Sequence, residues 1–164
     1  MDKKELEKIR LFLEQKWHEW KIIRNKTDKN ISEGMCNFSS FFLKEILGKE
    51  WKIAGGYAEP SFIFKEMKKQ IKGGFCKNGI FYDHHWITNG NLIIDITADQ
   101  FGDKKIIITD SGDKRYIENI KIPYSIYKKN AYSAIQWAKE YKEMQKNNEI
   151  ILYHGTTENS ANSL

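Results

Sequence analysis

A cysteine, a histidine and an aspartate follow one another in an order that could support nucleophilic chemistry. Cys36 lies at the expected start of an apolar helix, and a hairpin downstream carries His84 and Asp95. A nearby imidazole and a helix N-terminus both stabilise the thiolate, the form of cysteine that attacks a carbonyl carbon. A carboxylate can hold the imidazole in the useful tautomer. Each residue alone has a structural explanation, as a buried thiol or a solvated cross-strand pair, but their joint occurrence favours a catalytic set.

The hairpin at residues 80–97 decides which histidine belongs to this set. Its Asn-Gly dipeptide at positions 89–90 favours a two-residue type I′ turn, because both turn positions need a positive φ. With that loop, His84 lies directly opposite Asp95, close enough for the carboxylate to accept the imidazole N–H. Successive side chains alternate between faces, so His85 points to the other face. The predicted register therefore selects His84 rather than its neighbour.

The elements around these residues predict an α+β fold. Apolar residues at steps of three and four indicate amphipathic helices, and short apolar segments bounded by glycine and turn residues indicate strands. Helices are expected at residues 3–23, 36–47, 60–71 and 131–145, and strands at 51–57, 80–88, 91–97, 106–109 and, with a loop, 115–127. We expect the helix that begins at Cys36 to pack against an antiparallel sheet that carries His84 and Asp95.

Length and composition limit the class of protein. The chain of 164 residues fits one domain, and 40% hydrophobic with 13% aromatic residues argue against disorder. The net charge of +5 is spread over lysines that alternate with glutamates, which favours a solvated surface over a nucleic-acid patch. No apolar run approaches the roughly 20 residues of a membrane span. The N-terminus lacks the apolar region of a signal peptide, so we expect a cytoplasmic protein with reduced cysteines.

Four segments resemble the transglutaminase-like and papain-like superfamily of cysteine enzymes. Residues 34–43 look like its nucleophile helix, and residues 51–57 look like the strand that follows. Residues 84–87 match its His-x-Trp-aliphatic strand, and residues 94–97 match its aliphatic-Asp-x-Thr strand, although many members have proline where Ile96 stands. The resemblance covers roughly residues 30 to 102 and implies a papain-like fold. It also implies a triad of Cys36 as nucleophile, His84 as base and Asp95 as orienting group.

Further residues are candidates for the cleft. Papain-like members place an amide side chain six residues before the nucleophile to hold the oxyanion, and Asn30 occupies that position. With the backbone N–H of Cys36 it would suit a tetrahedral intermediate. Asp99 and Gln100 follow the Asp95 strand, where they could line the cleft or form a plain turn. Trp86 is expected on the face of His84, where it could shield the hydrogen bond to Asp95 or pack in the core.

Metal and cofactor sites find little support in the sequence. Cys36, Cys76, His84 and His85 could form a zinc set, but paired spacings such as Cys-x-x-Cys do not occur among them. The glycine pairs lack the spacing of a phosphate-binding loop. We therefore expect neither a metal nor a cofactor.

The C-terminal tail carries a separate resemblance. Residues 150–157, which include His154-Gly155-Thr156, resemble the opening strand of ADP-ribosyltransferase domains. We assign residues 1–148 to the papain-like domain and residues 149–164 to a tail, either the truncated start of a second domain, which we favour, or an ordinary terminal strand. Truncation would suggest a toxin or effector, for which delivery by a specialised secretion route stays open beside the cytoplasmic expectation.

The expected activity is thiol-dependent acyl transfer on an amide or ester through a cysteine thioester. Peptide hydrolysis, glutamine deamidation and transglutamination share that first half. We expect a protein or peptide substrate and neither a membrane nor a nucleic acid as partner. The alternative is a non-enzymatic papain-like scaffold that binds a protein partner, with an idle or buried cysteine.

Overall fold

The protein has an α+β fold, as the sequence predicted. The structure, a computed structural model, describes residues 1–27, 30–56, 76–77, 80–81, 83–118 and 124–146. The elements are α1 (Lys3–Ile23), α2 (Cys36–Leu47), β1 (Lys52–Gly56), β2 (Cys76–Lys77), β3 (Ile80–Phe81), β4 (His84–Thr88), β5 (Leu92–Asp95), the 3-10 helix η1 (Ala98–Phe101), β6 (Ile107–Asp110) and α4 (Tyr124–Lys146). The helix expected at residues 60–71 and the tail at residues 149–164 lie outside the described residues.

Local signals account for the bounds of the first two helices, which agree with those expected from the sequence. Helix α1 begins where the Asp2 carboxylate accepts a hydrogen bond of 2.8 Å from the backbone N–H of Glu5. Helix α2 ends at Gly48, whose φ of 88° suits glycine. Its start differs, because the N-cap residue Met35 makes no side-chain hydrogen bond to the helix. The first N–H groups of α2 therefore receive no acceptor from a capping side chain.

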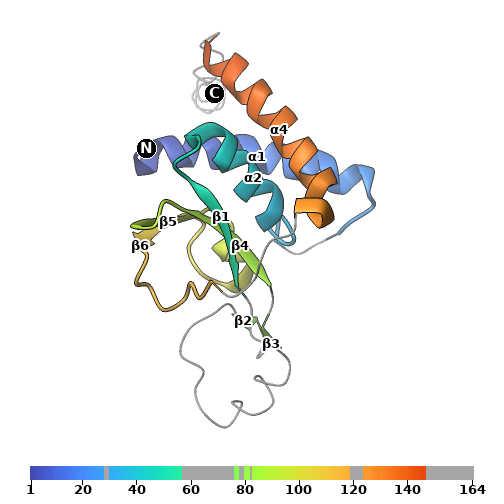
Figure 1. Ribbon diagram of the computed structural model, residues 1–164. Coiled ribbons are helices and arrows are strands. Elements are labelled where there is room, and N and C mark those ends of the chain that lie inside the picture. Colours follow the sequence, from blue (N-terminus) through green and yellow to red (C-terminus); the bar gives the residue numbers. More distant parts are fainter. Residues whose placement is uncertain (28–29, 57–75, 78–79, 82, 119–123, 147–164) are drawn as a thin grey trace, which may run out of the picture.

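The sheet separates two clusters of buried side chains. Its strands pair in the order β1-β4-β5-β6, each antiparallel to the next. Figure 1 shows α1, α2 and α4 gathered on one face of this sheet. Ile87 and Ile94 point into the core beneath these helices, whereas Trp86 and Ile93 point to the opposite face and pack with Tyr116. This alternation means that consecutive residues of β4 face different surroundings.

The predicted register of the hairpin was wrong by two residues. Thr88 pairs with Ile93 rather than Asn91, so four residues rather than two lie between the closing pair of the hairpin. The Asn89 side chain accepts hydrogen bonds of 3.0 and 2.8 Å from two following backbone N–H groups, which favours the longer loop. Continuing this register places Asp95 diagonally, rather than directly, across from His84. Because the shift is an even number of residues, both side chains still lie on the same face.

The segment after β6 also differs from expectation. The sequence pattern suggested a strand and loop at residues 115–127, but residues 115–118 form no regular structure and α4 begins at Tyr124. The turn before this segment is closed by Asp113, whose carboxylate accepts hydrogen bonds from the backbone and guanidinium of Arg115. This segment brings Tyr116 against the sheet, so a loop covers the face opposite the helices.

Candidate active site

The thiol of Cys36 lies at the start of α2, beside the start of β4. The residue is buried, with 7% of its surface exposed. Its Sγ lies 3.7 Å from Nδ1 of His85, and His84 also makes a hydrogen bond with the thiol. A helix N-terminus carries partial positive charge, which favours an anion at this position. The nucleophile candidate is thus held between two consecutive histidines.

These surroundings lower the pKa of the Cys36 thiol. Burial alone would raise it, because a thiolate is poorly solvated in the interior. The hydrogen bonds and positive charges of His84 and His85 outweigh burial and bring the pKa from 9.0 to about 6. Much of the cysteine is therefore expected as thiolate at neutral pH.

His84 and Asp95 form a buried hydrogen-bonded pair. Nε2 of His84 lies 2.7 Å from Oδ2 of Asp95, and both side chains are almost fully buried. Burial would lower the pKa of His84, but the charge and hydrogen bond of Asp95, with a further contribution from Cys36, raise it to about 10. Burial would raise the pKa of Asp95, but His84 and the hydrogen bonds of Thr97 lower it. The favoured state at neutral pH is accordingly a thiolate, an imidazolium and a carboxylate.

The Asp95 carboxylate is fixed by groups that the sequence analysis did not single out. Its Oδ1 accepts hydrogen bonds from the backbone N–H of Thr97 at 2.8 Å and from the Thr97 hydroxyl at 3.1 Å. Its Oδ2 accepts a third from the Tyr116 hydroxyl at 3.1 Å. Thr97 is the threonine of the aliphatic-Asp-x-Thr segment at residues 94–97, so the sequence did carry a signal for its contact with Asp95. Tyr116 comes from the loop after β6, and nothing local marks its contact with Asp95.

His85 is the main site residue that sequence reasoning left aside. In the pairing of β1 with β4, Gly55 lies opposite His85. A Cβ atom on Gly55 would come within 3.0 Å of Cδ2 of His85, so the imidazole packs closely against the Gly55 backbone. The sequence did indicate that His85 points to the sheet face opposite His84. Because α2 and Cys36 lie on that face, this orientation was the signal that His85 could reach the thiol.

Gln100 lies between the nucleophile segment and the His84–Asp95 pair. Its side-chain Nε2 is 3.3 Å from Nδ1 of His84 and donates a hydrogen bond of 2.9 Å to the Thr97 carbonyl. Its Oε1 accepts a hydrogen bond of 3.4 Å from the backbone N–H of Gly34. The glutamine is 9% exposed. Gln100 therefore connects the loop before Cys36, at Gly34, to the turn after β5, at Thr97.

A pocket opens beside the thiol. Its volume is about 300 Å³, which suits a side chain or a short peptide segment better than a large ligand. Phe101 lines the pocket, and its ring contacts the His84 ring edge to face, with centroids 4.9 Å apart. The described residues that line the pocket are Glu33, Gly34, Cys36, Asn37, Asp83, Gln100 and Phe101.

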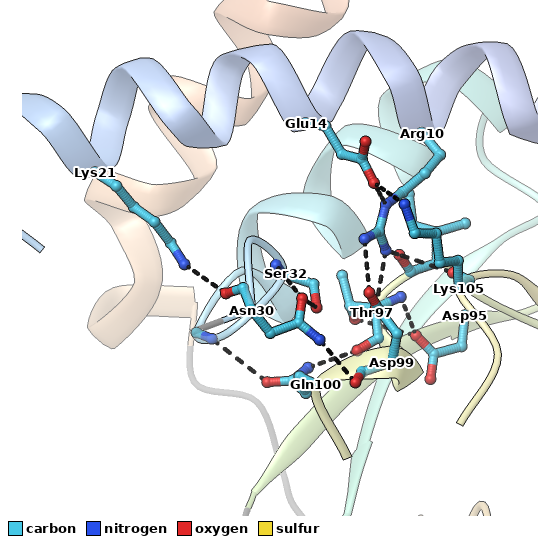
Figure 2. A network of polar contacts seen from close by, with 12 residues as sticks. Arg10, Glu14, Lys21, Asn30, Ser32, Asp95, Thr97, Asp99, Gln100 and Lys105 are labelled. Atoms are coloured by element: carbon cyan, nitrogen blue, oxygen red, sulfur yellow. Dashed lines mark hydrogen bonds and ion pairs between the residues drawn. The ribbon is translucent and has the colours of Figure 1, made fainter. Parts of the chain in front are cut away.

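Figure 2 shows Asn30 and Asp99 in a network of polar contacts. Neither residue is among those that line the pocket. The Asn30 amide donates to the Asp99 backbone carbonyl at 2.8 Å, and its Oδ1 accepts from the N–H and hydroxyl of Ser32. The Asp99 carboxylate binds the guanidinium of Arg10 from α1, which also donates to the Ile96 carbonyl. In this arrangement Asp99 supports the turn, and the oxyanion role of Asn30 stays a prediction.

Trp86 lies on the face of His84 and Asp95 and is 3% exposed. Its ring centroid is 6.1 Å from that of His84 and 5.1 Å from that of Tyr116. Trp86 packs in the cluster that covers the His84–Asp95 pair from one side, and it does not line the pocket. This placement fits both roles considered for it, because packing here also excludes water from the pair.

Metal ligands and membrane-spanning helices are two further features considered for the described residues. In the part of the chain that the structure describes, no three His, Cys, Asp or Glu side chains group as metal ligands. None of the helices in those same residues combines the length and apolar character needed to cross a bilayer. Comparisons with protein-family models, curated proteins and solved structures give no match.

Proposed function

We propose that this protein is a cysteine-dependent acyl-transfer enzyme with a papain-like arrangement, in which Cys36 is the nucleophile, His84 the proton carrier and Asp95 the group that orients His84. One observation carries the proposal. The Cys36 thiol lies at a helix start between two histidines, one of them bound to a buried carboxylate at 2.7 Å, and it borders a pocket of about 300 Å³.

The chemistry follows from the charge state of the three groups. The Cys36 thiolate adds to an amide or ester carbonyl, and the C=O π electrons move onto oxygen to give a tetrahedral oxyanion. The imidazolium of His84 gives its proton to the leaving amine or alkoxide as the C–N or C–O bond breaks, which leaves a thioester. Neutral His84 then takes a proton from water or an amine that attacks the thioester. Asp95 holds Nε2 of His84, so Nδ1 is the nitrogen that exchanges the proton.

The class of reaction follows from what resolves the thioester. Water gives hydrolysis of a peptide or deamidation of a glutamine, and an amine gives transglutamination. The antiparallel sheet that carries His84 and Asp95, with α2 packed on β4, supports the papain-like architecture implied by the sequence resemblance. A protein or peptide substrate fits this reading, because the thiol lies at the edge of a small pocket.

The test is the rate at which Cys36 reacts with iodoacetamide between pH 5 and 9, in protein whose Cys76 is replaced by serine. We expect rapid labelling with a midpoint near pH 6, and no labelling in a Cys36→Ala control. A positive result leads to a screen of peptide amides, glutamine peptides and primary amines. Slow labelling with a midpoint near 9 would contradict the proposal and favour the alternative, a papain-like scaffold that binds a protein partner.

A further inference from the structure

We propose that the side-chain amide of Gln100 binds the oxyanion that forms when Cys36 attacks its substrate. This inference rests on the proposed acyl-transfer function and adds a group to its machinery. It assigns to Gln100, from η1, a role for which the sequence resemblance had suggested Asn30.

Gln100 has the position that the role requires. It lines the same pocket as Cys36, and its Nε2 lies 3.3 Å from Nδ1 of His84, the ring nitrogen that is not bonded to Asp95. An oxyanion formed on a carbonyl attacked by Cys36 would lie in this pocket, within reach of an amide that borders both groups. Asn30 is not among the residues that line this pocket, and its amide donates to the Asp99 carbonyl while its Oδ1 accepts from Ser32.

The protonation of His84 leaves one N–H of Gln100 available. A glutamine Nε2 carries two hydrogens, and one of them is used by the Thr97 carbonyl at 2.9 Å. The second can bond to Nδ1 of His84 only while that nitrogen is unprotonated. In the imidazolium state both ring nitrogens are donors, so Nδ1 no longer accepts from Gln100. The raised pKa of His84 makes this the prevailing state at neutral pH, and the second N–H, which borders the pocket through Gln100, then no longer bonds to His84.

Gln100 is also held firmly enough to act on a developing charge. Its Oε1 accepts from the Gly34 N–H, and η1 is attached to α1 through the Asp99–Arg10 ion pair at 2.8 Å. Donors that are positioned beforehand stabilise an oxyanion without reorganisation in the transition state. The N–H groups at the start of α2, the helix that begins at Cys36, are a second set of donors, and the N-cap residue Met35 makes no side-chain hydrogen bond to them. The two sets of donors would bind the oxyanion together.

The experiment separates oxyanion binding from thiol reactivity by using two small reagents on the same protein. Iodoacetamide reacts with a thiolate by displacement of iodide, and no oxyanion forms. p-Nitrophenyl acetate reacts by addition to a carbonyl, which forms an oxyanion before p-nitrophenolate leaves. Both rates are measured at pH 8 in Cys76→Ser protein, for wild type, Gln100→Met, Gln100→Glu and a control, Gln15→Met, which replaces an exposed glutamine of α1.

We expect both Gln100 variants to keep the iodoacetamide rate and to lose up to about 10²-fold in the ester rate, the effect of removing one oxyanion donor. Gln100→Glu retains the side-chain shape and the acceptor for the Gly34 N–H but has no N–H to donate. A loss in this variant is therefore due to the missing donor and not to a disturbed loop. If both rates fall together, Gln100 merely holds the site in shape and the inference is wrong; if neither falls, it is also wrong. A wild-type thiol that alkylates no faster than free cysteine would overturn the proposed function itself.

Discussion

The guanidinium of Arg10 binds both carboxylate oxygens of Asp99, at 3.0 and 2.8 Å, across a separation of 89 residues in the sequence. Arg10 is 3% exposed and lies over the Trp17 ring, with its Cζ 4.6 Å from the ring centroid. The pair attaches α1 to η1, which follows Asp95 and carries Gln100. The buried Arg10 side chain thus holds η1 in place, and with it Gln100, which lines the pocket beside Cys36.

Replacement of Arg10 by methionine should destabilise the protein by about 3 kcal/mol, because removing one partner of a buried ion pair leaves the other charge uncompensated. The Ile96 carbonyl would lose a donor as well. Urea unfolding at pH 7 measures the loss. Arg24→Met is the matched control, since Arg24 is exposed and its contact is a cation–π interaction with Trp20, worth about 1 kcal/mol or less. Equal stability of the two variants would contradict the role given to Arg10.

Acyl transfer should show a bell-shaped dependence on pH. The rate rises as Cys36 ionises, with a limb at its pKa of about 6. It falls as His84 loses the proton that the leaving group needs, with a limb at a pKa of about 10. Iodoacetamide alkylation needs only the thiolate, so that rate should rise through pH 6 and stay level. A second limb in the alkylation profile would show that His84 is not the group responsible for the fall.

The two histidines should contribute unequally to the thiolate. In His84→Ala the imidazolium bound to Asp95 is lost, the pKa of Cys36 rises, and labelling at pH 7 should drop by about 10- to 100-fold. His85→Ala removes the contact at 3.7 Å but leaves the His84–Asp95 pair, so the drop should be only about a few-fold. His18→Ala, on the exposed side of α1, is the control. The reverse order of effects would make His85 the base and His84 a structural residue.

Two adjacent glycines of β1 should respond differently to alanine. In Gly55→Ala the new Cβ would lie 3.0 Å from Cδ2 of His85, so the ring must move slightly. We expect an altered midpoint of Cys36 alkylation and a loss of about 1 kcal/mol in stability. In Gly56→Ala the Cβ would overlap the backbone carbonyl of Ile117, which cannot yield as a side chain can. Urea unfolding should show a loss nearer 3 kcal/mol, and equal losses would refute the difference.

Much of the fold could be predicted because the signals for α1 and α2 are local. Asp2 caps α1 and Gly48 ends α2. Apolar residues three or four positions apart along each helix mark its buried face. The hairpin register failed for a local reason too, since the Asn89 side chain accepts hydrogen bonds within the loop and favours four residues over two between the closing pair. The predicted contact of His84 with Asp95 is kept because the register shifts by two residues, and an even shift leaves both side chains on the same face of the sheet.

The rest of the site depends on contacts between distant segments. The Tyr116 hydroxyl reaches Asp95 from an irregular loop, and no periodicity marks such a contact. Arg10 did carry a signal, because it falls on the apolar stripe of α1 between Leu6 and Leu13, where a charged side chain needs a buried partner. Which carboxylate provides that partner is fixed only by the packing of α1 against the turn after β5.

The same electrostatics that favour attack on a carbonyl would expose the protein to oxidation. A cysteine that is largely thiolate at neutral pH reacts with peroxide to give a sulfenic acid, and further oxidation is irreversible. Cys36 is only 7% exposed, so small oxidants would reach it while larger ones would not. Protein stored in air should therefore lose reactive thiol without losing its fold. A reductant added early, at the sulfenic acid stage, should restore the Cys36 thiol, whereas one added after further oxidation should not.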